Sequence, residues 1–200
     1  ELAEELKKFY TNEGYPHASI LYYETKINNR LYLYLNVDEG PHTKIVDFTI
    51  IGQFSRSEKF YREKFYELAS AKVQDKIYIK DDIEVAAKNL LIYLQNEGFV
   101  NAKISRVLTR TDRDDLGRGS ISLQLEEGLQ LKLTSIEFNG VSEKNKDGVA
   151  KALNLRPEQN LSLAQLENSL AELKTYYQNK GYLEFRIVNP AQDIITYSEN

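Results

Sequence analysis

The sequence predicts an α+β fold made of tandem copies of a small β-α-α-β-β module, because two motifs recur along the chain at domain-sized intervals. The first motif reads Asn-Glu-Gly-Tyr at residues 12–15, Asn-Glu-Gly-Phe at 96–99 and Asn-Lys-Gly-Tyr at 179–182. The second is an acidic turn, Val-Asp-Glu-Gly at 37–40 and Leu-Glu-Glu-Gly at 125–128. Spacings of 84, 83 and 88 residues between these glycines are too long for a solenoid and suit a small domain.

Each copy of the first motif marks the predicted end of an amphipathic helix. A glycine in the left-handed conformation stops a helix, and the apolar residue that follows packs back onto the last turn. We therefore expect this conformation at the three motif glycines, Gly14, Gly98 and Gly181.

The elements of the module are read from the middle repeat. An apolar run at 44–51 predicts a strand, and apolar residues at helical spacing within 57–69 predict the first helix. Asp81 and Glu84 form a capping-box pattern before a second helix, whose apolar face carries Ile83, Ala86, Ala87, Leu90, Leu91 and Leu94. Two further strands are expected at 102–108 and 120–125, separated by a charged turn at 111–119.

Cutting the chain at the acidic turns divides it into a partial module at 1–40, a complete module at 41–128 and a truncated module at 129–200. The first contains a helix end and strands at 18–23 and 31–37. The third contains a strand at 132–138, a weak helix at 149–153 and a helix capped by Ser162 and Gln165. We therefore expect the sequence to be a fragment of a longer protein.

Composition argues against several functional classes. The 26 basic and 30 acidic residues are interspersed, so the sequence predicts no basic face for nucleic acid. There is no cysteine, His17 and His42 lack metal-ligand spacing, and no nucleophile motif is present. Asp112, Asp114 and Asp115 alternate with arginines, which favours a solvated turn over a calcium loop. We expect no catalysis, no metal and no cofactor.

The module resembles the POTRA domain. The resemblance rests on the β-α-α-β-β order, on the acidic Glu-Gly turn after the last strand, and on Gly-aromatic-x-x-Ala-x-Ile after the second helix, at residues 14–20 and 98–104. The third copy departs from the motif because Phe185 stands where alanine is expected. The resemblance implies a periplasmic arm of an outer-membrane β-barrel protein, similar to the assembly proteins BamA and TamA. It also implies a three-stranded mixed sheet packed on two helices, with the last strand central and the second strand on an open edge.

Such an edge suits strand addition, in which an extended chain pairs with free backbone groups. The implied partners are unfolded outer-membrane protein precursors and assembly lipoproteins. Residues 18–23 are the candidate edge of the first module. The candidate edge of the middle module is Ala102, Lys103, Ile104, Ser105, Arg106, Val107 and Leu108. Alternatively these edges merely finish the sheet, with Lys103 and Arg106 as protective charges.

Two short junctions are predicted to let neighbouring modules touch and pivot through limited angles. They are formed by Glu39, Gly40 and Pro41 and by Glu127 and Gly128. Alternative functions are the arm of a TamA-like or two-partner secretion pore, and a peptidoglycan-binding or lipid-headgroup-binding module. The last of these requires a basic or aromatic groove.

Overall fold

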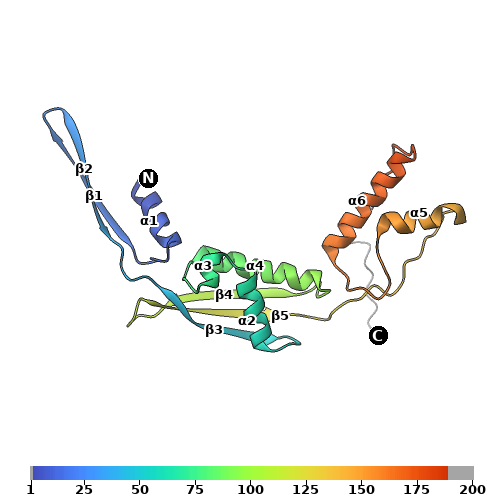
Figure 1. Cartoon of the computed structure of the whole chain (residues 1–200), viewed down its shortest axis with the longest axis horizontal. Helices are drawn as coiled ribbons and strands as arrows, with labels where there is room; N and C mark the ends of the chain where they lie inside the picture. The colour runs from blue at the N-terminus through green and yellow to red at the C-terminus, as the bar shows by residue number, and fades with distance from the viewer. Residues whose placement is uncertain (1, 189–200) are drawn as a thin grey trace. The chain divides into compact units, whose positions relative to one another are not determined.

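The computed structural model describes residues 2–188, which form two compact units. Of these residues, one unit contains those up to 91 and 103–126, and the other contains 92–102 and those from 127 onward. The module boundaries expected at residues 40 and 128 follow the sequence repeat and stay a prediction. The elements below are labelled as in Figure 1.

The N-terminal part of the first unit is a helix followed by a β-hairpin. Helix α1 spans Leu2–Asn12, and strands β1 (Ser19–Ile27) and β2 (Arg30–Asp38) pair antiparallel. Asn28 and Asn29 have φ angles of 49° and 62°, as a two-residue hairpin turn with matching twist requires. The hairpin therefore has a fixed register, in which the stacked rings of Tyr23 and Tyr34 lie opposite each other.

The middle repeat contains a three-stranded mixed sheet. Its elements are β3 (Lys44–Gln53), α2 (Glu58–Glu67), α3 (Ala71–Gln74), α4 (Lys80–Asn96), β4 (Lys103–Thr111) and β5 (Arg118–Glu126). The strand order is β3-β5-β4, with β5 parallel to β3 and antiparallel to β4. The predicted α+β class and mixed sheet, with the last strand in the centre, are confirmed.

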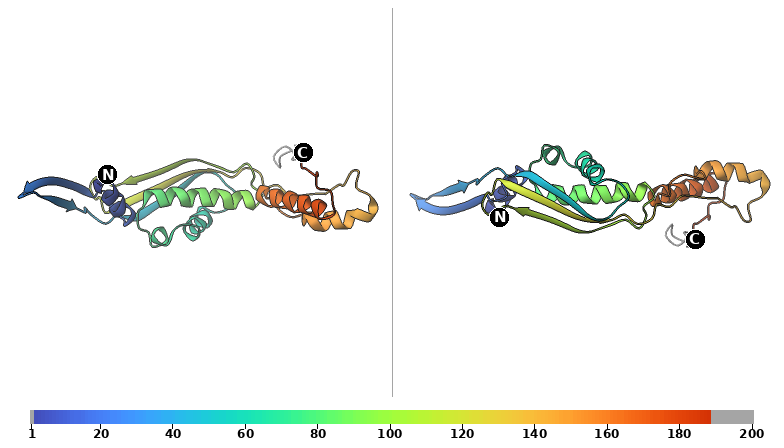
Figure 2. Two further views of the ribbon diagram at one scale, coloured as in Figure 1. Left: turned by 90° about the horizontal axis from the view of Figure 1, so that it is seen from above. Right: turned by 90° about the horizontal axis from the view of Figure 1, so that it is seen from below.

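The hydrophobic core lies between this sheet and its helices. Alternate residues of the central strand, Ile121, Leu123 and Leu125, are fully buried, as the period of two in a strand requires. Phe48 of β3 meets Phe65 of α2 with ring centroids 4.7 Å apart, while α4 lies along the sheet (Figure 2). Each such buried side chain contributes roughly 1.5–3 kcal/mol to folding.

The second unit contains a pair of packed helices, α5 (Glu143–Leu153) and α6 (Leu163–Asn179). Gly148 allows them to approach closely, because a Cβ at this position would collide with the Tyr176 hydroxyl. The predicted cap of α6 is confirmed, since the Gln165 N–H donates to the Ser162 hydroxyl at 3.2 Å.

The sequence repeat is also a structural repeat. Helices α4 and α6 both have 17 residues and end at the asparagine of the first motif. Gly14, Gly98 and Gly181 have φ angles of 92°, 101° and 92°, which confirms the predicted left-handed conformation. The following aromatic residue donates its N–H to the carbonyl five residues earlier in all three copies: Tyr15 to Tyr10, Phe99 to Leu94 and Tyr182 to Tyr177.

The predicted start of α4 needs correction. The helix begins at Lys80, so Asp81 lies inside its first turn and is not the cap. The preceding Tyr78 and Ile79 are buried, and this anchoring starts the helix earlier than the polar pattern suggests. The four-residue helix α3 was not predicted; Ser70 caps it by accepting from the Val73 N–H at 3.4 Å.

The third module also differs from its prediction. The strand expected at 132–138 is reduced to an isolated bridge between Lys132 and Asn160. Within residues 2–188 no strand lies beside 132–138, so the backbone groups of this segment have no neighbouring strand with which to form hydrogen bonds. Phe185, which replaces the motif alanine, stacks on Tyr177 with ring centroids 4.4 Å apart.

Candidate partner-binding surfaces

Strand β4 forms an open edge of the middle sheet. Its inner side pairs with β5, with Lys103 opposite Glu126 and Val107 opposite Leu123. In the described part of the chain, no hydrogen bond from outside the sheet reaches the backbone of β4. A row of unpaired N–H and C=O groups is therefore available for another strand.

The opposite edge of the same sheet, β3, is partly occupied. The Ile45 N–H donates to the Lys76 carbonyl at 2.7 Å, and the Ile50 N–H is 3.3 Å from the Glu58 carboxylate. Lys44 also forms an isolated bridge with Ile77. The two edges of the sheet thus differ in how much free backbone they present.

The predicted edge residues fall in and just before β4. Ala102 precedes the strand, is buried, and donates its N–H to the Phe99 carbonyl at 2.8 Å. The pairing register shifts between Ile104 and Arg106, which places a bulge at Ser105. Such a bulge bends an edge strand and limits uncontrolled pairing. Lys103, Ser105 and Arg106 are exposed, while Ile104, Val107 and Leu108 are half-buried.

The hairpin offers a second candidate surface. Of the residues predicted at 18–23, Ala18 is buried before the strand and the others belong to β1, which pairs with β2 and with no other strand of residues 2–188. Strand β2 also presents an apolar stripe, Leu31, Leu33, Leu35 and Val37, which is exposed. The corresponding residues of β5 form the buried core of the middle repeat.

The glycine of each predicted hinge has a positive φ angle. Gly40 and Gly128 have φ angles of 64° and 74°, which favour glycine, and the Gly40 N–H donates to Asp38 at 3.1 Å. Burial raises the pKa of Tyr10, and its hydrogen bond to the Glu39 carboxylate raises it further. Glu127 is buried, whereas Pro41 is exposed. Glu39 is therefore tied to α1 rather than free in solution.

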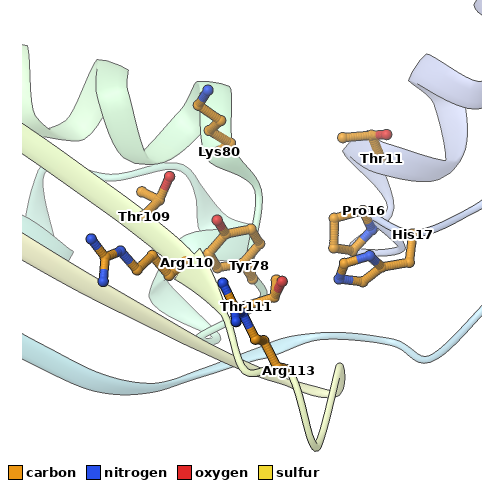
Figure 3. Close-up of a pocket in the computed structure, with 9 residues that line it drawn as sticks. All are labelled: Thr11, Pro16, His17, Tyr78, Lys80, Thr109, Arg110, Thr111 and Arg113. Carbon is orange, nitrogen blue, oxygen red and sulfur yellow. The ribbon is translucent and has the colours of Figure 1, made fainter.

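A cavity of about 850 Å³ lies in the first unit near the start of α4. It is lined by Thr11, Pro16, His17, Tyr78, Lys80, Thr109, Arg110, Thr111 and Arg113. Figure 3 shows the Thr111 hydroxyl and the Arg113 guanidinium on one side of it and the His17 imidazole on the other. Sequence reasoning missed this site, because His17 and Arg113 are far apart in the chain and Arg113 was assigned only to a solvated turn.

Residues 2–188 contain no cluster of three or more histidine, cysteine or acidic side chains that could hold a metal ion. The same residues include no helix that is long and apolar enough to cross a membrane. The described surface presents backbone edges, apolar side chains and a cation-lined cavity.

The fold and these surfaces define a repeated small α+β module with open sheet edges. Residues 131–200 match the POTRA family model, described as a surface antigen variable number repeat. Residues 131–200 are therefore similar to a POTRA domain, which agrees with the resemblance predicted from the sequence.

Solved structures similar to the chain include POTRA domains 3–5 of BamA from Haemophilus influenzae. They share 15% identity over 90% of this chain and 68% of that chain, with a TM-score of 0.45. POTRA domains 1–3 of Omp85 from Anabaena share 14% identity over 82% of this chain and 64% of that chain, with a TM-score of 0.35.

One curated relative is the mitochondrial protein Altered inheritance of mitochondria protein 18 from Vanderwaltozyma polyspora. It is 26% identical over 158 residues, which cover 74% of this chain and 46% of the relative. The chain thus spans less than half the length of this relative, and an identity this low does not establish a family.

Proposed function

We propose that this chain is part of the periplasmic arm of a BamA-type outer-membrane protein, and that it holds unfolded barrel precursors by strand addition without catalysing a reaction. The POTRA match and the repeated module support the arm. Assembly lipoproteins are proposed as further partners. The barrel that such an arm serves lies outside residues 1–200 in this proposal.

The observation that carries the proposal is the difference between the two edges of the middle sheet. Lys76 and Glu58 accept hydrogen bonds from backbone N–H groups of β3. Among residues 2–188, the backbone groups of β4 that face away from β5 have no such contacts. Main-chain hydrogen bonds give an added strand an affinity that depends little on its side chains. An unfolded barrel strand, which alternates apolar and polar residues, supplies such a chain.

A peptide titration tests this proposal. The 200-residue chain is titrated with an alternating barrel-strand peptide while backbone amide shifts are followed by NMR. The control is a peptide of the same sequence that is N-methylated at alternate residues. It keeps every side chain but lacks the backbone N–H groups on one edge, so it cannot form the β-sheet hydrogen bonds. We expect shifts along Lys103–Thr111 with the unmethylated peptide only, and β3 serves as an internal control.

Two results would count against strand addition. Equal binding of the methylated peptide would show that side chains dominate the interaction. Shifts confined to β3, or to the apolar stripe of β2, would assign the binding to a different surface.

A further inference from the structure

We propose that the cavity beside Arg113 is a phosphate-binding site. This inference does not depend on strand addition, because the cavity is built by side chains from α1, the loop after it, the start of α4 and the end of β4.

The charged residues that line the cavity are all basic. Lys80, Arg110 and Arg113 contribute cationic groups, and no acidic side chain lines the cavity, although the whole chain carries a net charge of −4. Lys80 is 3.9 Å from Glu84, so its charge is partly balanced. Within residues 2–188 neither Arg110 nor Arg113 has an ion-pair partner.

Two of the nearby aspartates, Asp112 and Asp115, accept hydrogen bonds from the backbone of the turn. Asp112 accepts a hydrogen bond from the Asp114 N–H at 2.9 Å, and Asp115 accepts one from the Gly117 N–H at 3.0 Å. These bonds hold the carboxylates on the backbone of the turn. They shape the loop that carries Arg113 without neutralising its guanidinium.

The donors approach the cavity from several directions. Figure 3 shows the hydroxyl of Thr111 turned toward His17, the guanidinium of Arg113 beside Thr111 on the side of Tyr78, and the guanidinium of Arg110 pointing away from His17. Nε2 of His17 is buried and has no hydrogen-bond partner. A tetrahedral phosphate accepts from donors on different sides, whereas a planar carboxylate presents only two oxygens. Arginine is also well suited to phosphate because its planar group donates two parallel hydrogen bonds.

The test uses the 200-residue chain and inorganic phosphate, with amide shifts of His17, Thr111 and Arg113 as the readout. Replacing Arg113→Gln removes the charged donor, and Thr111→Val removes the hydroxyl at similar volume. Arg156→Gln is the matched control, because Arg156 is exposed and lies outside the cavity. Unchanged thermal unfolding of each variant shows that it folds.

We expect phosphate to shift these amides, and Arg113→Gln to weaken binding about tenfold, as loss of one charge-assisted hydrogen bond predicts. Thr111→Val should weaken it less, and Arg156→Gln should leave it unchanged. Absence of shifts, equal weakening by Arg156→Gln, or equally tight binding of acetate would overturn the phosphate site.

Vesicles then distinguish the two sources of phosphate. Binding to phosphatidylglycerol vesicles that is competed by free phosphate and lost in Arg113→Gln would support a lipid headgroup. Phosphate binding without vesicle binding would support a soluble phosphate compound at the same site. Vesicle binding that persists in Arg113→Gln, without phosphate shifts, would contradict the proposal.

Discussion

The carbonyl oxygen of Gly98 accepts a hydrogen bond of 2.8 Å from the N–H of Leu131. The same bond joins Gly14 to Thr43 at 2.9 Å in the preceding repeat. In both cases the glycine follows the second helix of one module, and its partner lies three residues after the Glu-Gly turn that begins the next. Gly14 and Gly98 therefore each end a helix and also anchor the chain that follows.

Gly98→Ala should weaken this anchor. A Cβ would lie 2.7 Å from the Leu131 carbonyl oxygen, and the φ angle of 101° is unfavourable for alanine. We expect a loss of about 1–3 kcal/mol in the free energy of unfolding. Hydrogen exchange should show lower protection of the Leu131 amide.

Gly181→Ala is the matched control for that change. Its φ angle is 92°, but no described atom lies within 4 Å of the added Cβ. Gly181→Ala therefore introduces the unfavourable φ angle for alanine without a steric clash of the new Cβ. If both variants lose the same stability and Leu131 keeps its protection in Gly98→Ala, the glycine acts only as a helix stop.

Gly119 gives a steric prediction of a different kind. A Cβ at this position would lie 2.4 Å from Cδ2 of the buried Tyr78. Gly119→Ala should cost about 1–3 kcal/mol through overpacking. Adding Tyr78→Leu should recover part of this loss, so the two changes should be non-additive in chemical denaturation. Simple additivity would show that the ring is not the obstacle.

The matched positions Leu35 and Leu123 test the difference between the repeats. Leu35 is 41% exposed and its counterpart Leu123 is 0% exposed. Leu123→Ala should cost about 2–5 kcal/mol, as in other buried cores. Leu35→Ala should cost less than about 1 kcal/mol, because a side chain left in water gains little from folding. Equal losses in thermal unfolding would mean that the stripe on β2 is covered in solution.

The pH dependence of stability follows from Tyr66. Burial raises the pKa of its hydroxyl, and the nearby Arg62 guanidinium partly opposes this. The folded chain therefore holds this proton more tightly than the unfolded chain. The resulting stability is fully present below pH about 10 and is lost as the pH rises through the folded-state pKa.

Tyr66→Phe should make this alkaline loss shallower, measured as the free energy of unfolding from neutral pH upward. Tyr22→Phe, on the exposed hairpin, is the control. A steeper alkaline loss in Tyr66→Phe than in the unaltered chain would contradict the assigned direction.

The repeated motifs allowed most of the fold to be predicted. The glycines mark helix ends by a local backbone requirement, and β5 shows its buried face as a strict alternation. The polar pattern gave the wrong start for α4. Asp81 was expected to cap the helix, but the helix begins at Lys80, directly after the buried Tyr78 and Ile79. The strand expected at 132–138 depends on a neighbouring strand, which is a tertiary condition that local sequence does not contain.

The candidate surfaces were predictable to different extents. The residues of β4 follow from module order once the resemblance is known, although its bulge at Ser105 depends on the pairing with β5. The cavity was not predictable, because His17, Tyr78 and Arg113 come together only through the fold.

The central claim is that β4 accepts an added strand, and intermolecular NOEs test it most directly. In a complex of the isotope-labelled chain with an unlabelled barrel-strand peptide, we predict regular cross-strand NOEs between the peptide backbone and residues Lys103–Thr111. A bound peptide whose NOEs fall only on side chains, or only on other elements, would contradict the claim.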